Sequence, residues 1–209
     1  MTLNLYDNEH MKLFALGGVV AVASYAVFGQ GTFIYDQQSS TDEILPQYGS
    51  GVLLQATLPA GQTFTPSLTG IDFIRLKFND ADLLDGLGAT IYLDLRANSL
   101  TGSVLGVTMP VTIGNAFRGV TNFFFPNTIA LTPGDMYCFQ VFVTGGPWNV
   151  DVASYGYIGG FRYSQGGATG GDFWFREGLY VVPEPGATAF GALAVLMLAA
   201  RRAVRRWQL

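Results

Sequence analysis

The sequence predicts an all-β protein built as an antiparallel β-sandwich or jelly roll. Its 209 residues include 27 glycines, and aromatic residues reach 14% while charged residues make up only 12%. This composition is typical of a turn-rich β protein. Short runs of alternating apolar residues recur about every ten residues between Gly, Pro, Asn and Asp, as in sandwiches and jelly rolls. Between the two ends of the chain, no segment shows a helical period.

Two runs show the strand period most clearly. In residues 89–96 every second residue is apolar, which predicts a strand with one buried face. Residues 71–78 alternate in the same way, with Arg75 and Lys77 on the side expected to face solvent. The side chains expected to point inward from these two strands are Ala89, Ile91, Leu93, Leu95, Ile74, Leu76 and Phe78.

Further strands are expected along the rest of the chain, which gives about eight to ten in all. Pro110 and Pro126 are expected to end two of them, and residues 59–61 and 133–135 to form turns. In the run 137–143, the expected inward residues are Tyr137, Phe139, Val141 and Val143. The other expected strands are residues 52–58, 103–108, 120–125, 148–153 and 173–175.

Cysteine, histidine and net charge exclude several classes of function. Cys138 is the only cysteine, so the chain cannot form an internal disulfide or a Cys-based metal site. His10, the only histidine, precedes the first apolar run, which excludes a Ser-His-Asp triad and a His-ligated zinc site from the mature domain. Residues 30–185 carry 13 acidic and 6 basic side chains, a net charge of −7, which argues against nucleic acid as a partner.

The N-terminal segment has the pattern of a secretory signal peptide. Residues 13–29 are uncharged and largely apolar and follow Lys12. Small residues allow cleavage after Gly29, the preferred position, or after Ala26. Because signal peptides need a positive head, and residues 1–10 carry two acids, we expect Met11 to be the true start.

The C-terminal segment has the pattern of a membrane anchor. Residues 186–200 contain no charge; as a helix they would cover roughly 22 Å of the roughly 30 Å hydrocarbon core. Pro183 and Pro185 cannot lie inside a helix, so Glu184 is expected in an extended segment just outside the membrane. The arginines after the apolar run extend its reach and place this end in the cytoplasm. They are Arg201, Arg202, Arg205 and Arg206.

This tail resembles the PEP-CTERM sorting signal of bacterial surface proteins. The resemblance rests on Pro183, Glu184 and Pro185, followed by one hydrophobic span and the terminal arginine cluster. It implies export through the secretion machinery, an inner membrane-anchored precursor, and cleavage near the motif by an exosortase, a membrane cysteine protease. The resemblance also implies a final place at the cell surface or in the extracellular matrix, where exopolysaccharide and biofilm are the associated material.

The body of the chain resembles a recurrent domain of PEP-CTERM surface proteins. The resemblance covers roughly residues 35–178 and rests on short motifs. These are residues 62–66, 131–134, 159–160 and 175–178. The expected organisation is therefore a signal peptide in residues 1–29, a β-sandwich in residues 30–180, and the sorting signal with its transmembrane helix in residues 181–209.

Two groups of residues are candidate binding sites, each with a structural alternative. Asp80, Asp82 and Asp85 bring three carboxylates near a glycine, as a weak calcium candidate, although the third lies one position late for an EF-hand. A solvated turn is the alternative. Aromatic residues near glycines late in the chain could stack on sugar rings or simply fill the core. They are Trp148, Tyr155, Tyr157, Tyr163 and Trp174.

The sequence marks no catalytic constellation. No two carboxylates are singled out as a glycosidase pair, and no Gly-rich phosphate loop joins a strand to a helix. We therefore expect a non-enzymatic exported surface or matrix protein without a cofactor. The alternative is a lectin-like, carbohydrate-binding sandwich anchored to the envelope.

Overall fold

The structure, a computed structural model, describes residues 31–42, 51–153 and 156–182. The chain divides into two compact units, of which one is Phe33–Tyr180 and the other combines Met1–Thr32 with Val181–Leu209. Almost all of the second unit lies outside the described residues, including the expected signal peptide and the expected tail span. Among the described residues, no helix has the length and apolar character needed to cross a membrane.

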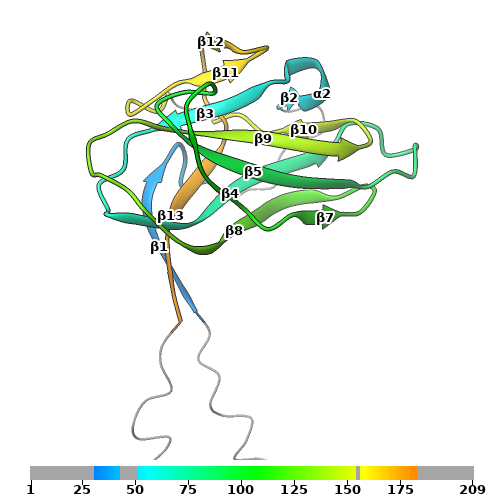
Figure 1. Ribbon diagram of the computed structural model, residues 1–209. Coiled ribbons are helices and arrows are strands. Elements are labelled where there is room, and N and C mark those ends of the chain that lie inside the picture. Colours follow the sequence, from blue (N-terminus) through cyan, green and yellow to red (C-terminus); the bar gives the residue numbers. More distant parts are fainter. Residues whose placement is uncertain (1–30, 43–50, 154–155, 183–209) are drawn as a thin grey trace, which may run out of the picture. The chain divides into compact units, whose positions relative to one another are not determined.

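Two antiparallel sheets pack as a sandwich, which confirms the expected all-β fold (Figure 1). Sheet A has six strands: β1 (Thr32–Gln38), β2 (Val52–Leu53), β4 (Gly70–Asp80), β8 (Arg118–Ala130), β10 (Trp148–Val150) and β13 (Phe175–Val181). Sheet B has seven: β3 (Ala60–Phe64), β5 (Ala89–Ala97), β6 (Val104–Val107), β7 (Val111–Ile113), β9 (Tyr137–Gly145), β11 (Arg162–Ser164) and β12 (Gly167–Thr169). The described helix is a single turn, α2 (Leu54–Thr57).

Sheet A is organised around β4. Strand β8 pairs with one edge of β4, and β13 and β10 pair with successive parts of the other edge, through Phe175↔Leu76 and Trp148↔Asp80. The strand order β1-β13-β4-β10-β2 places the last strand of the chain between the first strand and β4. The ends of the folded domain therefore meet in one sheet.

Sheet B is organised around β5 and β9, which pair over their whole length from Ala89↔Gly145 to Ala97↔Tyr137. Strands β6 and β7 pair with successive parts of the outer edge of β5. On the far side of β9 the order continues through β3 and β11 to β12.

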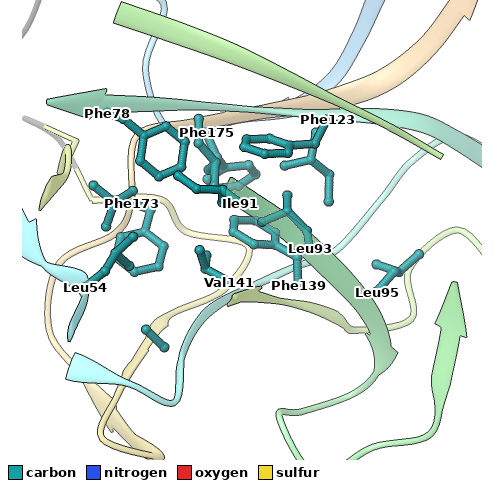
Figure 2. Packing of buried hydrophobic residues seen from close by; sticks show 14 of the residues in the cluster. Leu54, Phe78, Ile91, Leu93, Leu95, Phe123, Phe139, Val141, Phe173 and Phe175 are labelled. Carbon is teal, nitrogen blue, oxygen red and sulfur yellow. The ribbon is translucent and has the colours of Figure 1, made fainter. Parts of the chain in front are cut away.

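The core lies between the sheets and is rich in phenylalanine (Figure 2). Phe139 of sheet B packs edge-on against Phe175 of sheet A, with ring centroids 5.6 Å apart. Phe78 packs against Phe123 in the same way at 5.8 Å. These rings fill the space between sheets because the facing strands alternate large apolar and polar residues.

The strands expected from strict alternation are confirmed. The predicted inward residues of β4 and β5 are all buried in the core, and so are Tyr137, Phe139 and Val141 of β9. Val143 is partly buried and packs against the same core. The alternation of apolar residues predicted the inward side chains correctly because each of these strands is central in its sheet and has one face in the core.

Two expectations for residues 52–61 were wrong. Residues 52–58 form only the two-residue β2 before the chain turns into α2, whose Leu54 is fully buried. Residues 59–61 were expected to form a turn, but Ala60 and Gly61 begin β3 and pair with Val141 and Gln140 of β9.

Pro126 does not end its strand, contrary to expectation. β8 continues to Ala130, because the pairing with β4 shifts register between Ile71 and Phe73, opposite the proline. At such an irregularity in an edge strand, the missing N–H of proline removes no ladder hydrogen bond.

The chain also forms strands that the sequence did not indicate. β1 was not expected, and β13 extends from Phe175 to Val181 although the predicted closing strand ended at Phe175. In the glycine-rich stretch, β11 and β12 form a small hairpin beside β3. The described part of the chain thus has thirteen strands, more than the eight to ten expected.

Candidate functional site

Buried polar groups gather where β1 pairs with β13. Tyr35, Gln37, Arg176, Glu177 and Gly178 define this region, the closing junction, since it joins the first strand of the domain to the last. It lies next to the point where the chain continues towards Pro183.

Glu177 is the most strongly perturbed acid of the closing junction. It is 0% exposed and lies on the same face of β13 as the core residue Phe175. One carboxyl oxygen, Oε1, accepts a hydrogen bond from the backbone N–H of Gln37 at 3.1 Å, but Oε2 has no partner among the described residues. Burial, with a smaller contribution from the negative charge of Asp36, raises the pKa of Glu177 to about 8. The group therefore holds its proton at neutral pH.

Asp36 lies close to Glu177 and stays ionised. Burial acts to raise the pKa of Asp36, but hydrogen bonds from Ser67 and Leu68 outweigh it and leave the pKa below its ordinary value. The backbone N–H groups of Ser67 and Leu68 donate to Oδ2 at 2.7 and 2.9 Å, and the Ser67 hydroxyl contacts Oδ1. Two neighbouring carboxyl groups thus take opposite protonation states because only one of them is well supplied with donors.

Tyr157, one of the expected sugar-binding residues, packs into the closing junction. Its hydroxyl donates to Oε1 of Gln37 at 2.9 Å and accepts from the backbone N–H of Thr65 at 3.4 Å. Its ring meets Phe175 edge-on at 5.2 Å. Burial, assisted by the nearby Glu177 and other acids, raises the pKa of Tyr157 to about 12. Tyr157 is half-buried, and its hydroxyl and ring contacts position it against Gln37 and Phe175.

Arg176 covers the outer side of the closing junction. Its guanidinium lies 5.1 Å from the ring centroid of Tyr35 and 5.0 Å from that of Trp174, and its Nε donates to the carbonyl of Ser40 at 3.1 Å. Such cation–π contacts contribute more where water is excluded, and Arg176 is buried.

A second cation, Lys77, packs on the same outer face of sheet A. Its ammonium forms an ion pair with Asp151 at 3.1 Å and lies 5.2 Å from the ring centroid of Trp174. Both charged side chains are buried. The alternating pattern of residues 74–78 placed Lys77 on this face of β4, but it predicted that the face would be exposed to solvent. The face is instead covered by aromatic rings.

Those rings come from several strands. Arg75 lies over Phe33 and Tyr35, with its carbon Cζ 5.1 and 5.6 Å from the centroids. Phe33 in turn packs against Phe73 at 4.8 Å and Tyr180 at 5.0 Å. The one available signal was the run of residues 173–176, in which three aromatic residues precede an arginine. It could not reveal its partner strands, which are distant in the sequence.

Gly178 allows the closest backbone approach in the closing junction. It has a positive φ of 154°, and a Cβ atom there would overlap the carbonyl oxygen of Ile34 on β1. Only glycine fits this position without moving one of the two strands.

The two tryptophans expected to bind sugar are both buried, Trp148 in the core and Trp174 under Lys77 and Arg176 on the outer face of sheet A. Trp148 is 0% exposed, and Trp174 is 1% exposed and donates its indole N–H to the carbonyl of Asp42 at 2.6 Å. Neither presents a ring face to solvent. Tyr163 is half-buried on β11 and packs edge-on against Phe161 at 5.1 Å, and Tyr155 lies outside the described residues. The described members of the set therefore form no common stacking platform.

The three aspartates considered for calcium each hold the backbone of their own loop, and Asp80 also holds the loop at Ala116. Asp80 accepts from the N–H groups of Asp82 at 3.0 Å and Ala116 at 2.7 Å. Asp82 accepts from Leu84 at 3.1 Å, and Asp85 from Leu87 at 2.7 Å. Within the described ranges, no three Asp, Glu, His or Cys side chains are grouped so as to hold a metal ion. The arrangement is that of consecutive Asx turns.

Cys138 is buried on β9, and burial raises the pKa of its thiol to about 12. A thiol of that pKa carries no useful thiolate fraction at neutral pH.

The remaining predicted residues belong to the tail. Pro183, Glu184, Pro185 and the arginines Arg201, Arg202, Arg205 and Arg206 lie outside the described residues. No protein-family model matches the chain, and a search of curated proteins finds no relative.

Proposed function

We propose that this chain is an exported, non-enzymatic protein of the cell surface or extracellular matrix. A signal peptide in residues 1–29 directs export, and the apolar run that begins at Gly186 holds the precursor in the inner membrane. An exosortase then cuts near Pro183-Glu184-Pro185, and the β-sandwich is displayed or released, in contact with exopolysaccharide.

The observation that carries this proposal is the place of β13. This strand has partners on both sides, β1 and β4, and its residues Phe175–Gly178 are buried. It ends at Val181, and in the sequence only Val182 separates it from Pro183. The described fold thus uses the chain almost up to the tripeptide, as expected for cargo followed by a removable sorting signal.

The closing junction fits such a tethered domain. Any pull from the anchor reaches the sandwich through β13, which is held by two strand neighbours, by the Glu177–Gln37 hydrogen bond and by Arg176 between two aromatic rings. A last strand at an edge would be held from one side only and would open more easily.

The finer features of the expected fold form part of the proposal. They are the jelly-roll arrangement of the sandwich, a signal-peptide helix before it and a transmembrane helix after it. Helices at both ends follow from the uncharged runs and their flanking charges.

Replacement of Pro183-Glu184-Pro185 by three alanines tests the sorting proposal. In cells that possess an exosortase, the wild type is expected to lose its tail and leave the inner membrane, and the variant to keep its precursor size and stay there. Ile158→Ala, at a fully exposed loop position of the domain, is the matched control and should be processed like the wild type. Equal size and location of the variant and the wild type would show that the tail is only an anchor.

A further inference from the structure

Strand β6 and the residues just after it carry four exposed large apolar side chains. Val104, Leu105, Val107 and Met109, here called the β6 surface, are between 41% and 52% exposed. Four large apolar side chains of this exposure fall within six residues, although single exposed apolar residues are ordinary in soluble proteins. A cluster of this kind is typical of an interaction site.

The β6 surface is held in place by its surroundings. β6 pairs with β5 through Asp94↔Val107 and Arg96↔Val104, and Gly106 between them faces inward against Ile129. Immediately after β6, the Thr108 hydroxyl accepts a hydrogen bond from the backbone N–H of Leu93 at 2.9 Å. The apolar side chains therefore point outward from a fixed strand, and little order has to be gained on binding.

This surface is electrically neutral, unlike the rest of the domain. Residues 97–117 contain no charged side chain. The nearest charges on the adjacent strand, Asp94 and Arg96, neutralise each other in an ion pair at 2.8 Å. Residues 30–185 as a whole carry 13 acids against 6 bases. Exposed strands often carry a protruding lysine that prevents association, and β6 has none.

We propose that the β6 surface is the contact through which two copies of this chain associate. Two acidic bodies repel each other across most of their faces, so they can approach most closely where both are neutral. A second copy offers the same neutral, apolar strand, and a twofold contact buries both strands without desolvating an unpaired charge. A basic partner would gain nothing from this neutral surface, because charge complementarity would direct it elsewhere on the acidic domain.

Disulfide cross-linking of the full-length chain in the membranes of expressing cells tests this contact. Cys138 is the only natural cysteine and is buried, so a cysteine introduced at the surface reports on its own position. Four single variants are compared: Val104→Cys, Leu105→Cys, Val107→Cys and Met109→Cys. Val152→Cys, an exposed apolar position outside the β6 surface, is the matched control for random collision.

At least one of the four variants is expected to give several-fold more disulfide-linked homodimer than Val152→Cys under mild oxidation. Val104→Asp is then added to the cysteine variant that gives the strongest cross-link, or Leu105→Asp when that cysteine is at position 104. The added aspartate puts an unpaired charge in the contact, so the amount of dimer should fall to the control level. Thermal melts of the variants check that the domain stays folded.

Two results would overturn the proposal. One is dimer formation no greater than in the control at all four positions. The other is cross-linking mainly to a different protein, which would make the β6 surface a binding site for that protein. Neither result depends on processing at the tail, so this test is independent of the sorting proposal.

Discussion

The backbone N–H of Gln37 donates a hydrogen bond to the carboxyl oxygen Oε1 of Glu177 at 3.1 Å, across a sequence separation of 140 residues. This bond joins the first strand of the sandwich to the last. The sandwich can therefore fold completely only when residue 37 and residue 177 are on the same side of the membrane. The junction also places a protonated acid where the two strands meet.

Glu177 makes the stability of the domain depend on pH. Its pKa is about 8 in the folded domain against an ordinary value of 4.5, so the folded state keeps a proton that the unfolded chain loses. The stabilisation is complete below the unfolded pKa and is lost as the pH rises through about 8. The wild-type melting temperature is thus expected to fall between about pH 5 and pH 8. Glu177→Gln, which cannot titrate, should fall less over this range and be the more stable protein at the alkaline end.

Calorimetric melts of both proteins over this range provide the measurement. Asp135→Asn, at an exposed turn, is the control and should follow the wild type. Parallel profiles for Glu177→Gln and the wild type would show that Glu177 does not titrate with a raised pKa.

Gly178→Ala should destabilise the closing junction. The added methyl group would overlap the carbonyl oxygen of Ile34, so β1 or β13 must move. Overpacking of this kind costs about 1–3 kcal/mol, seen as a lower denaturation midpoint in urea. Gly114→Ala, where an added Cβ meets nothing within 4 Å, should leave the midpoint nearly unchanged. An equal effect of both substitutions would contradict the close approach of the two strands.

Lys77→Met should be strongly destabilising, because it leaves the buried carboxylate of Asp151 without its ion-pair partner. Removal of one partner from a buried pair costs about 3–5 kcal/mol. The double variant Lys77→Met with Asp151→Asn should recover part of this loss, since no unpaired charge is left. Urea unfolding of the single and double variants measures the difference. No recovery in the double variant would mean that the loss comes from packing alone.

Trp148→Ala should act on the fold and not on a sugar site. Trp148 is fully buried, and removal of a buried tryptophan side chain costs about 3–5 kcal/mol. On a glycan array, Trp148→Ala is therefore expected to change binding only where it also unfolds the domain. Tyr163→Ala, at a half-buried position, serves as the comparison. Selective loss of glycan binding by a folded Trp148→Ala variant would favour the lectin-like alternative.

The sequence was sufficient to predict the central strands. In β4, β5 and β9 one face is in the core, so apolar residues recur at every second position and mark the side chains that point inward. The composition was sufficient for the all-β class.

Other elements could not be predicted because distant residues satisfy their polar groups. β3 contains the buried Gln62, whose amide donates to Asp172 at 2.8 Å and accepts from the N–H of Phe173 at 3.0 Å. From the sequence alone, such a polar stretch after Pro59 is typical of a turn. β1 and β13 depend on each other in the same way, through contacts between residues that are about as far apart as the domain allows.

The candidate site was missed for a related reason. Glu177 and Arg176 look like exposed charges in the sequence, but both are buried, Glu177 beside Gln37 of β1 and Arg176 against the rings of Tyr35 and Trp174. The aromatic residues were recognised as a group, yet their burial depended on which sheet face each one occupies. That information is absent from a local pattern.

The intact mass of the protein recovered from the surface or medium of exosortase-containing cells tests the central proposal most directly. We expect a chain that has lost residues 1–29, or 1–26, and that ends between Val182 and Gly186, because a cut before Val181 would remove part of a central strand. A mature protein that still carries the apolar run from Gly186 to Leu209 would contradict the sorting proposal, and one that ends within β13 would contradict the role given to that strand.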